Sequence, residues 1–243
     1  AHHGIPAPRT AAFFSPSEAE TFLKSARFPL VGKLRRGSAS SNVFLLRTPA
    51  QARAHIQRAF TTGFPLYNLQ NRYGDLLRNA PTVSRKAAVA LRYLYRRFSE
   101  PDYSRFMGRE KGYVLLQDFI PNDGSDLRVV VVGDRLAAVR RRTRANDFRA
   151  SGSGLLEFPD HTLPSTCREL AFELTAKLGV PSMGYDFITG LDGHLHVIEM
   201  SYGFPSENFL DGAGGYWTRQ GDFVCGDVRL QEWMVDWVRT QIV

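Results

Sequence analysis

Two acidic residues near the end of the chain, Asp186 and Glu199, constrain the fold most strongly because each lies in an apolar, strand-like run. The runs cover residues 183–188 and 196–201, and a turn-forming segment at 191–194 separates them. A β-hairpin over this segment would place both carboxylates side by side on one face. Carboxylates among apolar residues are too costly to bury without a counter-charge, and a hard divalent cation is the usual one. The pattern therefore predicts a metal-binding hairpin.

The composition is that of a globular protein. The chain has 243 residues, which is enough for one large domain or two small lobes with a hydrophobic core, and its 43% hydrophobic content is ordinary. It contains neither an apolar run of about eighteen residues nor a signal peptide, so we predict no membrane partner. The chain starts without an initiator methionine, as expected of a processed chain or of a piece of a longer one. The only cysteines, Cys167 and Cys225, form no Cys-x-x-Cys pair, which argues against a zinc site and favours the reducing cytoplasm.

The chain is basic, with a formal charge of +7 and a pI near 9.6. Such a charge permits binding to nucleic acid or to anionic surfaces. However, no helix-turn-helix, RNA-recognition signature or zinc finger is present, and the arginines are spread along the sequence. Nucleic-acid binding is therefore the less favoured alternative function.

The order of the expected elements predicts an α+β fold. In a front lobe over residues 1–110 we expect two strands joined by a Gly/Ser loop, a helix opened by Thr48 and Pro49, and a basic helix at 84–98. In a rear lobe over residues 111–243 we expect the following elements: strands at 113–119, 127–132 and 136–140, a helix with a Thr166–Glu169 capping box, the acidic hairpin, and a C-terminal helix at 228–243.

A lysine and a small-residue loop in the front lobe form a candidate phosphate site. Lys33 lies on a strand expected at residues 30–34, and residues 35–41 follow it as Arg-Arg-Gly-Ser-Ala-Ser-Ser. Backbone N–H groups and serine hydroxyls of such a loop can hold phosphate, although the same residues also fit a flexible surface hairpin. The loop is not a Walker motif, because no Gly-Lys-Ser/Thr follows.

Two further segments carry candidate nucleotide contacts. The strand at 115–121 can offer backbone groups to an adenine edge, or it can simply end a core strand. Asp126 and Arg128 share one strand face, so they either pair with each other or reach a ribose hydroxyl and a phosphate.

Arginines crowd the segment that follows, at positions 140, 141, 142, 144 and 149. Strand alternation allows either Arg140 and Arg142 or Arg141 alone to face inward. Arg149 lies in a glycine-bearing loop and is the expected phosphate ligand. On the acidic hairpin, Glu199 and Ser201 share a face with Asp186 opposite, as a Mg²⁺ site completed by phosphate and water would require.

Taken in order, these motifs resemble the ATP-grasp superfamily and, within it, the RimK-type ligases. The resemblance runs from Gly4 to about Gly203 and is most specific at Asp126-Leu-Arg128 and Asn146-Asp-Phe-Arg149. It implies two α/β lobes with mainly antiparallel sheets that clamp a nucleotide.

The resemblance also implies roles for single residues. Lys33 would contact the α- and β-phosphates of ATP, and a loop that includes Gly37, Ser38, Ala39 and Ser40 would close over them. The adenine hinge would consist of Gln117, Asp118, Phe119 and Ile120. Asp126 would bind the ribose, and Arg128 and Arg149 would face phosphate or the reacting acyl group. Mg²⁺ would be held by Asp186, Glu199 and Ser201, the last of which stands where the family usually has Asn.

The implied activity is that of an ATP-dependent ligase joining a small-molecule or peptide carboxylate to an amine or thiol through an acylphosphate. Aromatic segments at 67–73 and 202–216 would line the binding site of the acceptor amine or thiol, or their side chains would instead pack in the hydrophobic core. Family members carry a preceding domain and an earlier nucleotide-contacting lysine, and this sequence starts after both. A separate chain that supplies the domain, a missing segment or reduced function would each explain their absence. The alternative is a nucleotide-binding protein of this fold without catalysis.

Overall fold

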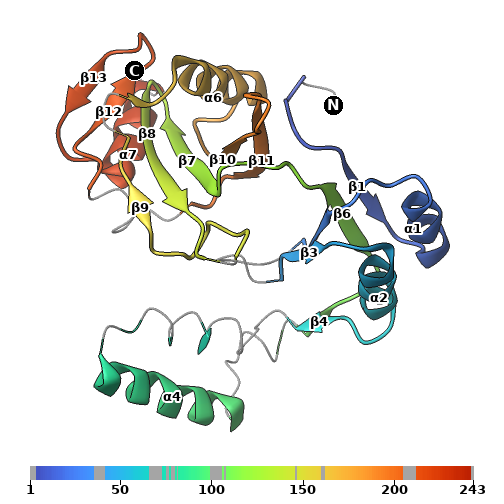
Figure 1. Ribbon diagram of the computed structural model, residues 1–243. Helices are drawn as coiled ribbons and strands as arrows, with labels where there is room; N and C mark the ends of the chain where they lie inside the picture. The colour runs from blue at the N-terminus through green and yellow to red at the C-terminus, as the bar shows by residue number, and fades with distance from the viewer. Residues whose placement is uncertain are drawn as a thin grey trace. The chain divides into compact units, whose positions relative to one another are not determined.

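The computed structural model of the protein describes residues 4–35, 42–65, 73–74, 77, 80, 82–98, 106, 108–145, 147–159, 162–204 and 212–241. The chain forms two compact units. The front unit covers Arg9–Phe119, and the rear unit combines Ala1–Pro8 with Ile120–Val243. Figure 1 shows the helices and antiparallel sheets that make up both units, which confirms the predicted α+β class.

The front unit is built on a four-stranded antiparallel sheet in the order β1-β6-β2-β3. Its elements are β1 (Thr10–Phe13), α1 (Pro16–Leu23), β2 (Leu30–Lys33), β3 (Phe44–Leu46), α2 (Pro49–Phe60), β4 (Phe64–Pro65), α4 (Val83–Phe98), β5 (Arg109–Glu110) and β6 (Val114–Asp118). Helices α1 and α2 and the sheet share one apolar core. Strand β6, expected in the rear lobe, pairs with β1 and β2 and therefore belongs to the front sheet.

Helix α2 begins where its sequence predicts. The Thr48 hydroxyl accepts a hydrogen bond from the Gln51 backbone N–H at 3.3 Å, and the Gln51 side chain accepts one from the backbone N–H of Arg47 at 2.7 Å. These bonds satisfy N–H groups at the start of the helix, which have no partner within it.

A buried histidine on α2 packs against the front sheet. The His55 ring lies between the rings of Phe44 and Phe64, with centroids 5.0 and 4.8 Å away. Gly32 on β2 leaves room for it, since a Cβ at that position would lie 2.7 Å from Nε2 of His55. Burial, reinforced by the nearby charge of Arg58, lowers the pKa of His55 from 6.5 to about 4. His55 is therefore neutral in the folded protein at neutral pH.

The rear unit is built on a seven-stranded antiparallel sheet in the order β11-β10-β7-β8-β12-β13, with β9 paired to β8. Its elements are β7 (Ser125–Val132), β8 (Arg135–Arg142), β9 (Leu156–Glu157), α6 (Ser165–Leu178), β10 (Ser182–Thr189), β11 (Leu195–Ser201), β12 (Gly215–Thr218), β13 (Phe223–Cys225) and α7 (Leu230–Gln241). The predicted hairpins β7–β8 and β10–β11 are confirmed. The predicted capping box at Thr166 is wrong, because α6 begins at Ser165 after Pro164 and no side chain caps it.

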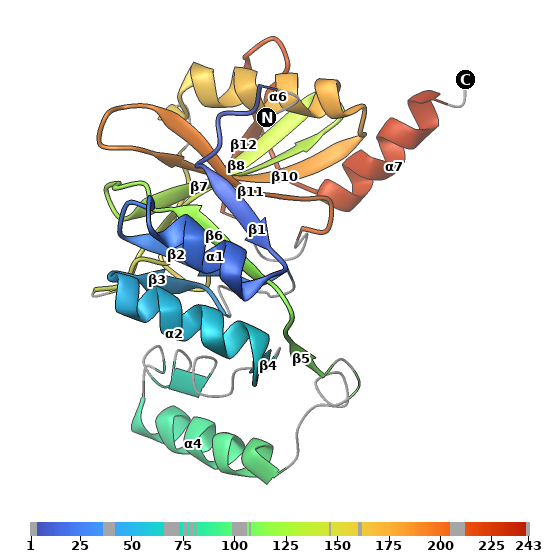
Figure 2. The same ribbon diagram turned by 90° about the vertical axis from the view of Figure 1, so that its right-hand side faces the viewer.

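The two faces of the rear sheet differ in chemistry. Leu127, Val129 and Phe187 pack with α6 on one face. Val130 on β7 and Val139 on β8 point to the other face, where they pack near α7. Figure 2 shows α6 and α7 as separate helices of this unit. Beyond the apolar patch near α7, the same sheet face becomes charged, and this charged part holds the candidate site.

The neutral state of His55 predicts acid sensitivity. The unfolded chain takes up the proton below pH 6.5 and the folded chain only near pH 4, so stability is full above 6.5 and is lost as the pH falls toward 4. This group should lower the unfolding free energy by about 2 kcal/mol between pH 7 and pH 5. Urea unfolding at the two pH values measures the loss, and His55→Leu should remove most of it. Equal pH dependence in the wild type and the variant would contradict this assignment.

Candidate functional site

Strand register brings five charged residues onto one face of the rear sheet. Asp126 on β7 pairs with Arg141 on β8, and Arg128 on β7 pairs with Asp186 on β10. Asp186 in turn pairs with Glu199 on β11. Residues directly opposite in a sheet point the same way, and so do alternate residues of one strand. The five side chains therefore run across four neighbouring strands.

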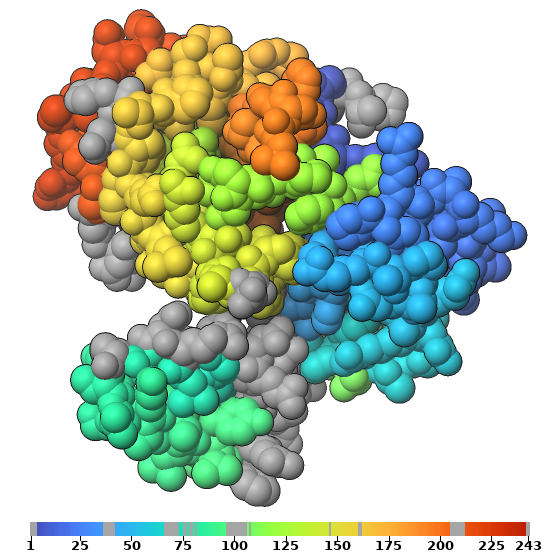
Figure 3. Space-filling model, in the orientation of Figure 1, coloured from blue at the N-terminus to red at the C-terminus, as the bar shows by residue number. Residues whose placement is uncertain are grey.

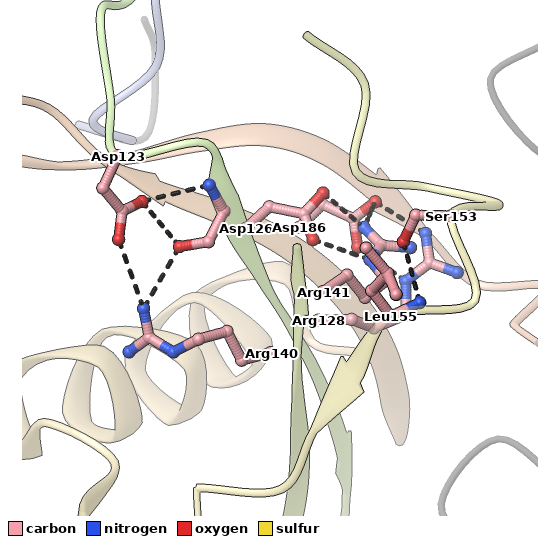
Figure 4. A network of polar contacts seen from close by, with 9 residues as sticks. Asp123, Asp126, Arg128, Arg140, Arg141, Ser153, Leu155 and Asp186 are labelled. Atoms are coloured by element: carbon pink, nitrogen blue, oxygen red, sulfur yellow. Dashed lines mark hydrogen bonds and ion pairs between the residues drawn. The ribbon is translucent and has the colours of Figure 1, made fainter. Parts of the chain in front are cut away.

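Four of these residues form a continuous chain of ion pairs, Arg128–Asp186–Arg141–Asp126, drawn in Figure 4. Arg128 binds both oxygens of Asp186 at 2.6 Å. Arg141 binds both oxygens of Asp126, at 2.6 and 2.7 Å, and its Nη2 also lies 2.8 Å from Oδ2 of Asp186. Arg141 thus bridges the two carboxylates. We call Asp126, Arg128, Arg141 and Asp186 the charge cluster.

The charge cluster is nearly removed from water. The side chain of Arg141 is 3% exposed and that of Asp186 5%, whereas that of Arg128 is 17% exposed. Burying an isolated charge is strongly unfavourable, and excellent geometry is needed to compensate for it. Two acids and two bases with paired hydrogen bonds meet this condition. Arg128 is the member nearest to solvent.

The two carboxylates of the charge cluster differ in proton affinity. Burial raises the pKa of Asp126 to about 6, against the opposing effect of Arg141. Burial would also raise the pKa of Asp186, but the hydrogen bond from Arg128 and the charges of Arg141 and Arg128 outweigh it and hold this pKa below its ordinary value. Asp186 is therefore ionised at neutral pH.

Glu199 lies at the exposed edge of this face because of a β-bulge. Asp186 pairs with Glu199 but Phe187 pairs with Val197, so the pairing skips Ile198. An extra residue reverses the alternation of side chains. Val197 consequently points into the α6 core and Glu199 points to the charged face, where it is exposed. The predicted pairing of the two acids is confirmed.

The predicted metal site consists of two carboxylates and a hydroxyl. Both oxygens of Asp186 accept from guanidinium groups, so a cation would share this carboxylate with them or replace one of them. The Ser201 hydroxyl donates to the carbonyl of Gly203 at 2.9 Å. Within the described residues, no group of three or more His, Cys, Asp or Glu side chains is placed to hold a metal. The metal role of Asp186, Glu199 and Ser201 therefore stays a prediction; two carboxylates would suit a cation that takes its other ligands from phosphate and water, as Mg²⁺ does.

The arginine-rich segment divides as strand alternation requires. Arg141 alone points into the charge cluster. Arg140 lies on the opposite face, where its Nη1 donates to the Ser125 hydroxyl at 3.1 Å. Arg142 forms an ion pair with Glu157 at 2.9 Å near solvent. Strand alternation alone leaves this choice open, and Arg141 is a site residue that the sequence motifs do not reveal. Its register opposite Asp126 was the signal that could have identified it.

Arg149 is held by its own loop. Its Nε and Nη2 donate to the carboxylate of Asp147 at 2.9 and 2.8 Å, and its backbone N–H donates to the same group at 3.0 Å. Asp147 is also 4.0 Å from Arg144. This loop therefore carries more arginine than carboxylate charge. The proposed phosphate contact of Arg149 stays a prediction.

In the structure Asp126 and Arg128 pair with residues of other strands rather than with each other. Each residue takes its partner from the adjacent strand instead, because paired residues on neighbouring strands are closer than alternate residues of one strand.

The predicted nucleotide contacts of the front unit lie on or near β2 and β6. Lys33 is the last residue of β2, and residues 36–41, with Gly37, Ser38, Ala39 and Ser40, lie outside the described part of the chain. The Gln117 side chain donates to the Thr10 hydroxyl at 2.9 Å, and Asp118 forms an ion pair with Arg9 at 3.2 Å.

The backbone of the predicted hinge is partly engaged within the protein. The N–H groups of Asp118 and Phe119 donate to the carbonyls of Arg9 and Pro29, at 2.9 and 3.4 Å. Ile120 begins the rear unit, and its carbonyl accepts from the Asn122 side chain at 2.9 Å. The adenine-contacting role of these residues stays a prediction.

The aromatic segments predicted near the acceptor are only partly described, since residues 67–72 and 205–211 lie outside the described ranges. Tyr73 is buried, with its ring 5.7 Å from that of Tyr93. Tyr216 packs edge-on against Trp233 at 4.9 Å. These two tyrosines have structural roles, as the alternative of core packing holds, whereas Tyr202 is exposed.

The bridging role of Arg141 predicts a large loss of stability on its removal. Arg141→Met would leave Asp126 without its partner, and breaking a buried pair in this way should lower the unfolding free energy by about 3–5 kcal/mol. Arg142→Met, at the next residue of the same strand, removes only exposed ion pairs, those with Glu157 and Asp123, and should leave the unfolding free energy nearly unchanged. Urea unfolding of both variants tests this. Similar losses of unfolding free energy in the two variants would show that Arg141 stabilises the protein no more than an exposed arginine does.

Comparison with known proteins identifies the fold. Residues 102–207 match the model of the RimK-like ATP-grasp domain. Probable alpha-L-glutamate ligases from Rhodopirellula baltica and Xanthomonas oryzae pv. oryzae are each 33% identical, over 129 and 132 residues, or 49% and 53% of this chain. The matches cover 32% and 38% of those proteins, so the chain spans only about a third of their length.

Two solved structures share the fold at low sequence identity. An ADP complex of N5-carboxyaminoimidazole ribonucleotide synthetase has a TM-score of 0.54 and 10% identity, over 90% of this chain and 46% of the other. The biotin carboxylase domain of Hydrogenobacter thermophilus 2-oxoglutarate carboxylase, solved with MgADP, ADP and bicarbonate, has a TM-score of 0.50 and 15% identity, over 85% and 38%. The chain therefore has the ATP-grasp fold, and its residues 102–207 are similar to the RimK-like domain of that fold.

Proposed function

We propose that this chain acts as an ATP-dependent ligase that joins a carboxylate to an amine or thiol. The observation that supports this most directly is the charge cluster, which puts an ionised Asp186 next to the exposed Glu199 inside the RimK-like match. Two similar structures hold ADP, one of them with magnesium, which makes Mg-ATP the proposed cofactor.

The proposed reaction has two steps. The substrate carboxylate attacks the γ-phosphorus of ATP, and ADP leaves. The amine then attacks the carbonyl carbon of the resulting acylphosphate and loses a proton, phosphate leaves, and an amide remains. A thiol would give a thioester in the same way.

The proposed work of the protein is positioning and charge neutralisation. Asp186 and Glu199 would hold Mg²⁺, which neutralises phosphate charge when bound. Arg128, the member of the charge cluster nearest to solvent, would face the transferred phosphoryl group, and Arg149 would bind phosphate or the acyl group. Such preorganised charges favour the transition state without acid–base chemistry by side chains.

The substrates and partners are also proposals. The curated relatives are named alpha-L-glutamate ligases, so glutamate is the first amine to test. We propose a cytoplasmic location, and small-molecule or peptide substrates that supply the carboxylate and the amine. Among the described residues, no helix is long and apolar enough to cross a membrane.

Glu199→Gln should abolish carboxylate-dependent ADP release while the fold stays intact, because the substitution removes one of the two negative charges at the proposed metal site. ADP release over a panel of carboxylates with glutamate as the amine measures the effect, and circular dichroism checks the fold. Glu173→Gln, the same change at an exposed residue of α6, is the control and should retain activity. Wild-type turnover in the Glu199 variant would remove the metal assignment.

Lys33→Ala should weaken Mg-ATP binding about tenfold, since a charge-assisted hydrogen bond contributes roughly 1.5–3 kcal/mol. Isothermal titration calorimetry with Mg-ATP measures it, with Lys24→Ala in the same unit as the control. Equal affinity of the two variants would mean that Lys33 makes no phosphate contact.

A second candidate is a nucleotide-binding protein of this fold without catalysis. Its support is that arginines already engage both oxygens of Asp186. Such a protein would bind Mg-ATP in calorimetry yet release no ADP with any carboxylate–amine pair. The two experiments above therefore separate the candidates.

A further inference from the structure

Helix α4 of the front unit is amphipathic and carries charge of one sign only. It has five basic residues and no acidic one over Val83–Phe98. Its start is fixed by Thr82, whose hydroxyl accepts from the backbone N–H of Arg85 at 3.3 Å. Residues spaced by three or four positions share a face of a helix. Val83, Ala87, Leu91 and Leu94 follow this spacing, and we call them the apolar stripe.

The apolar stripe faces solvent rather than a core. Val83 is 84% exposed, Leu91 70% and Leu94 51%, and the neighbouring Tyr95 is 65% exposed. Arg85 and Arg92 share a different face of the helix, seven residues apart, and both are exposed. Tyr93 points away from the stripe and lies against the ring of Tyr73 at 5.7 Å. The predicted helix at 84–98 is confirmed, and its apolar stripe is exposed. Figure 3 shows α4, in green, with its side chains at the surface.

We propose that the apolar stripe of α4 lies on an anionic lipid bilayer, with the basic residues at the headgroups. Such a surface offers both an apolar layer and negative charge, and these are the two properties that α4 matches. The helix has 16 residues, fewer than the roughly 20 that are needed to span a membrane, so it would lie in the surface. The prediction of no membrane partner rests on the lack of a spanning run, which does not bear on a helix that lies in the membrane surface.

Other occupants match α4 less well. Nucleic acid would satisfy the basic residues but leave the exposed leucines unexplained. A second copy would bring two helices without acidic residues together, between chains that each carry a formal charge of +7, and they would repel each other. The inference does not depend on the proposed ligase activity.

Co-sedimentation with vesicles tests the proposal on the full chain. The wild type should bind vesicles of phosphatidylcholine mixed with phosphatidylserine at least about tenfold more strongly than phosphatidylcholine alone, and high salt should weaken this binding. Leu91→Ser with Leu94→Ser should lower binding by about tenfold or more, because both side chains would lose their apolar contact. Arg85→Glu with Arg92→Glu should have a similar effect, since each basic residue near an anionic surface contributes roughly fivefold.

Helix α7 provides the matched control. Its Val235 and Val238 are 59% and 53% exposed, but the helix also carries Glu232 and Asp236. Val235→Ser with Val238→Ser should leave vesicle binding unchanged. Circular dichroism and thermal unfolding should show that every variant remains folded, because all the changed side chains are exposed.

Four results would overturn the proposal. The wild type could ignore anionic vesicles, or the Leu91/Leu94 variant could bind them as the wild type does. A dimer that this variant converts to monomer in sedimentation would assign the stripe to a second copy. Equal binding of duplex nucleic acid by both proteins, without vesicle binding, would assign α4 to nucleic acid.

Discussion

The bridge that Arg141 makes between Asp126 and Asp186 is the interaction on which the candidate site depends. Two carboxylates buried on one sheet face would repel each other and draw protons from water. A guanidinium between them, with its flat fork of donors, offsets this repulsion and fixes the orientation of both carboxylates. Arg128 then completes the pairing from the solvent side. The pairing of each carboxylate with a guanidinium group thus allows a charged face to be buried in an antiparallel sheet.

The hairpin adds the exposed part of the site. Without the bulge at Ile198, strict alternation could not place both Val197 in the core and Glu199 on the charged face. The one extra residue of the bulge thus lets Val197 pack in the core while Glu199 stays on the charged face. The result is a graded site in which Asp186 is buried and held ionised, while Glu199 stands at its edge in water. Preorganised charge next to an accessible carboxylate is what phosphoryl transfer requires of a protein.

The two units contribute different kinds of support to the proposals. The rear unit supplies the charge cluster and most of the family match, and its chemistry can be argued from contacts within the structure. The front unit supplies Lys33 and β6, whose nucleotide contacts are inferred from resemblance. Its helix α4 has an unrelated property, an uncovered apolar stripe in a wholly basic helix, which is why it supports a separate proposal.

The sequence by itself determined the local elements and the pairing within each hairpin. Thr48 and Gln51 specify the start of α2, and the apolar runs around Asp186 and Glu199 specify two strands in register, because these signals act over a few residues. Tertiary structure decided which strands became neighbours. It placed Arg128 against Asp186 and Arg141 against Asp126, and it moved β6 into the front sheet. Those partners are far apart in sequence, and an isolated strand carries no record of which residue will lie opposite it.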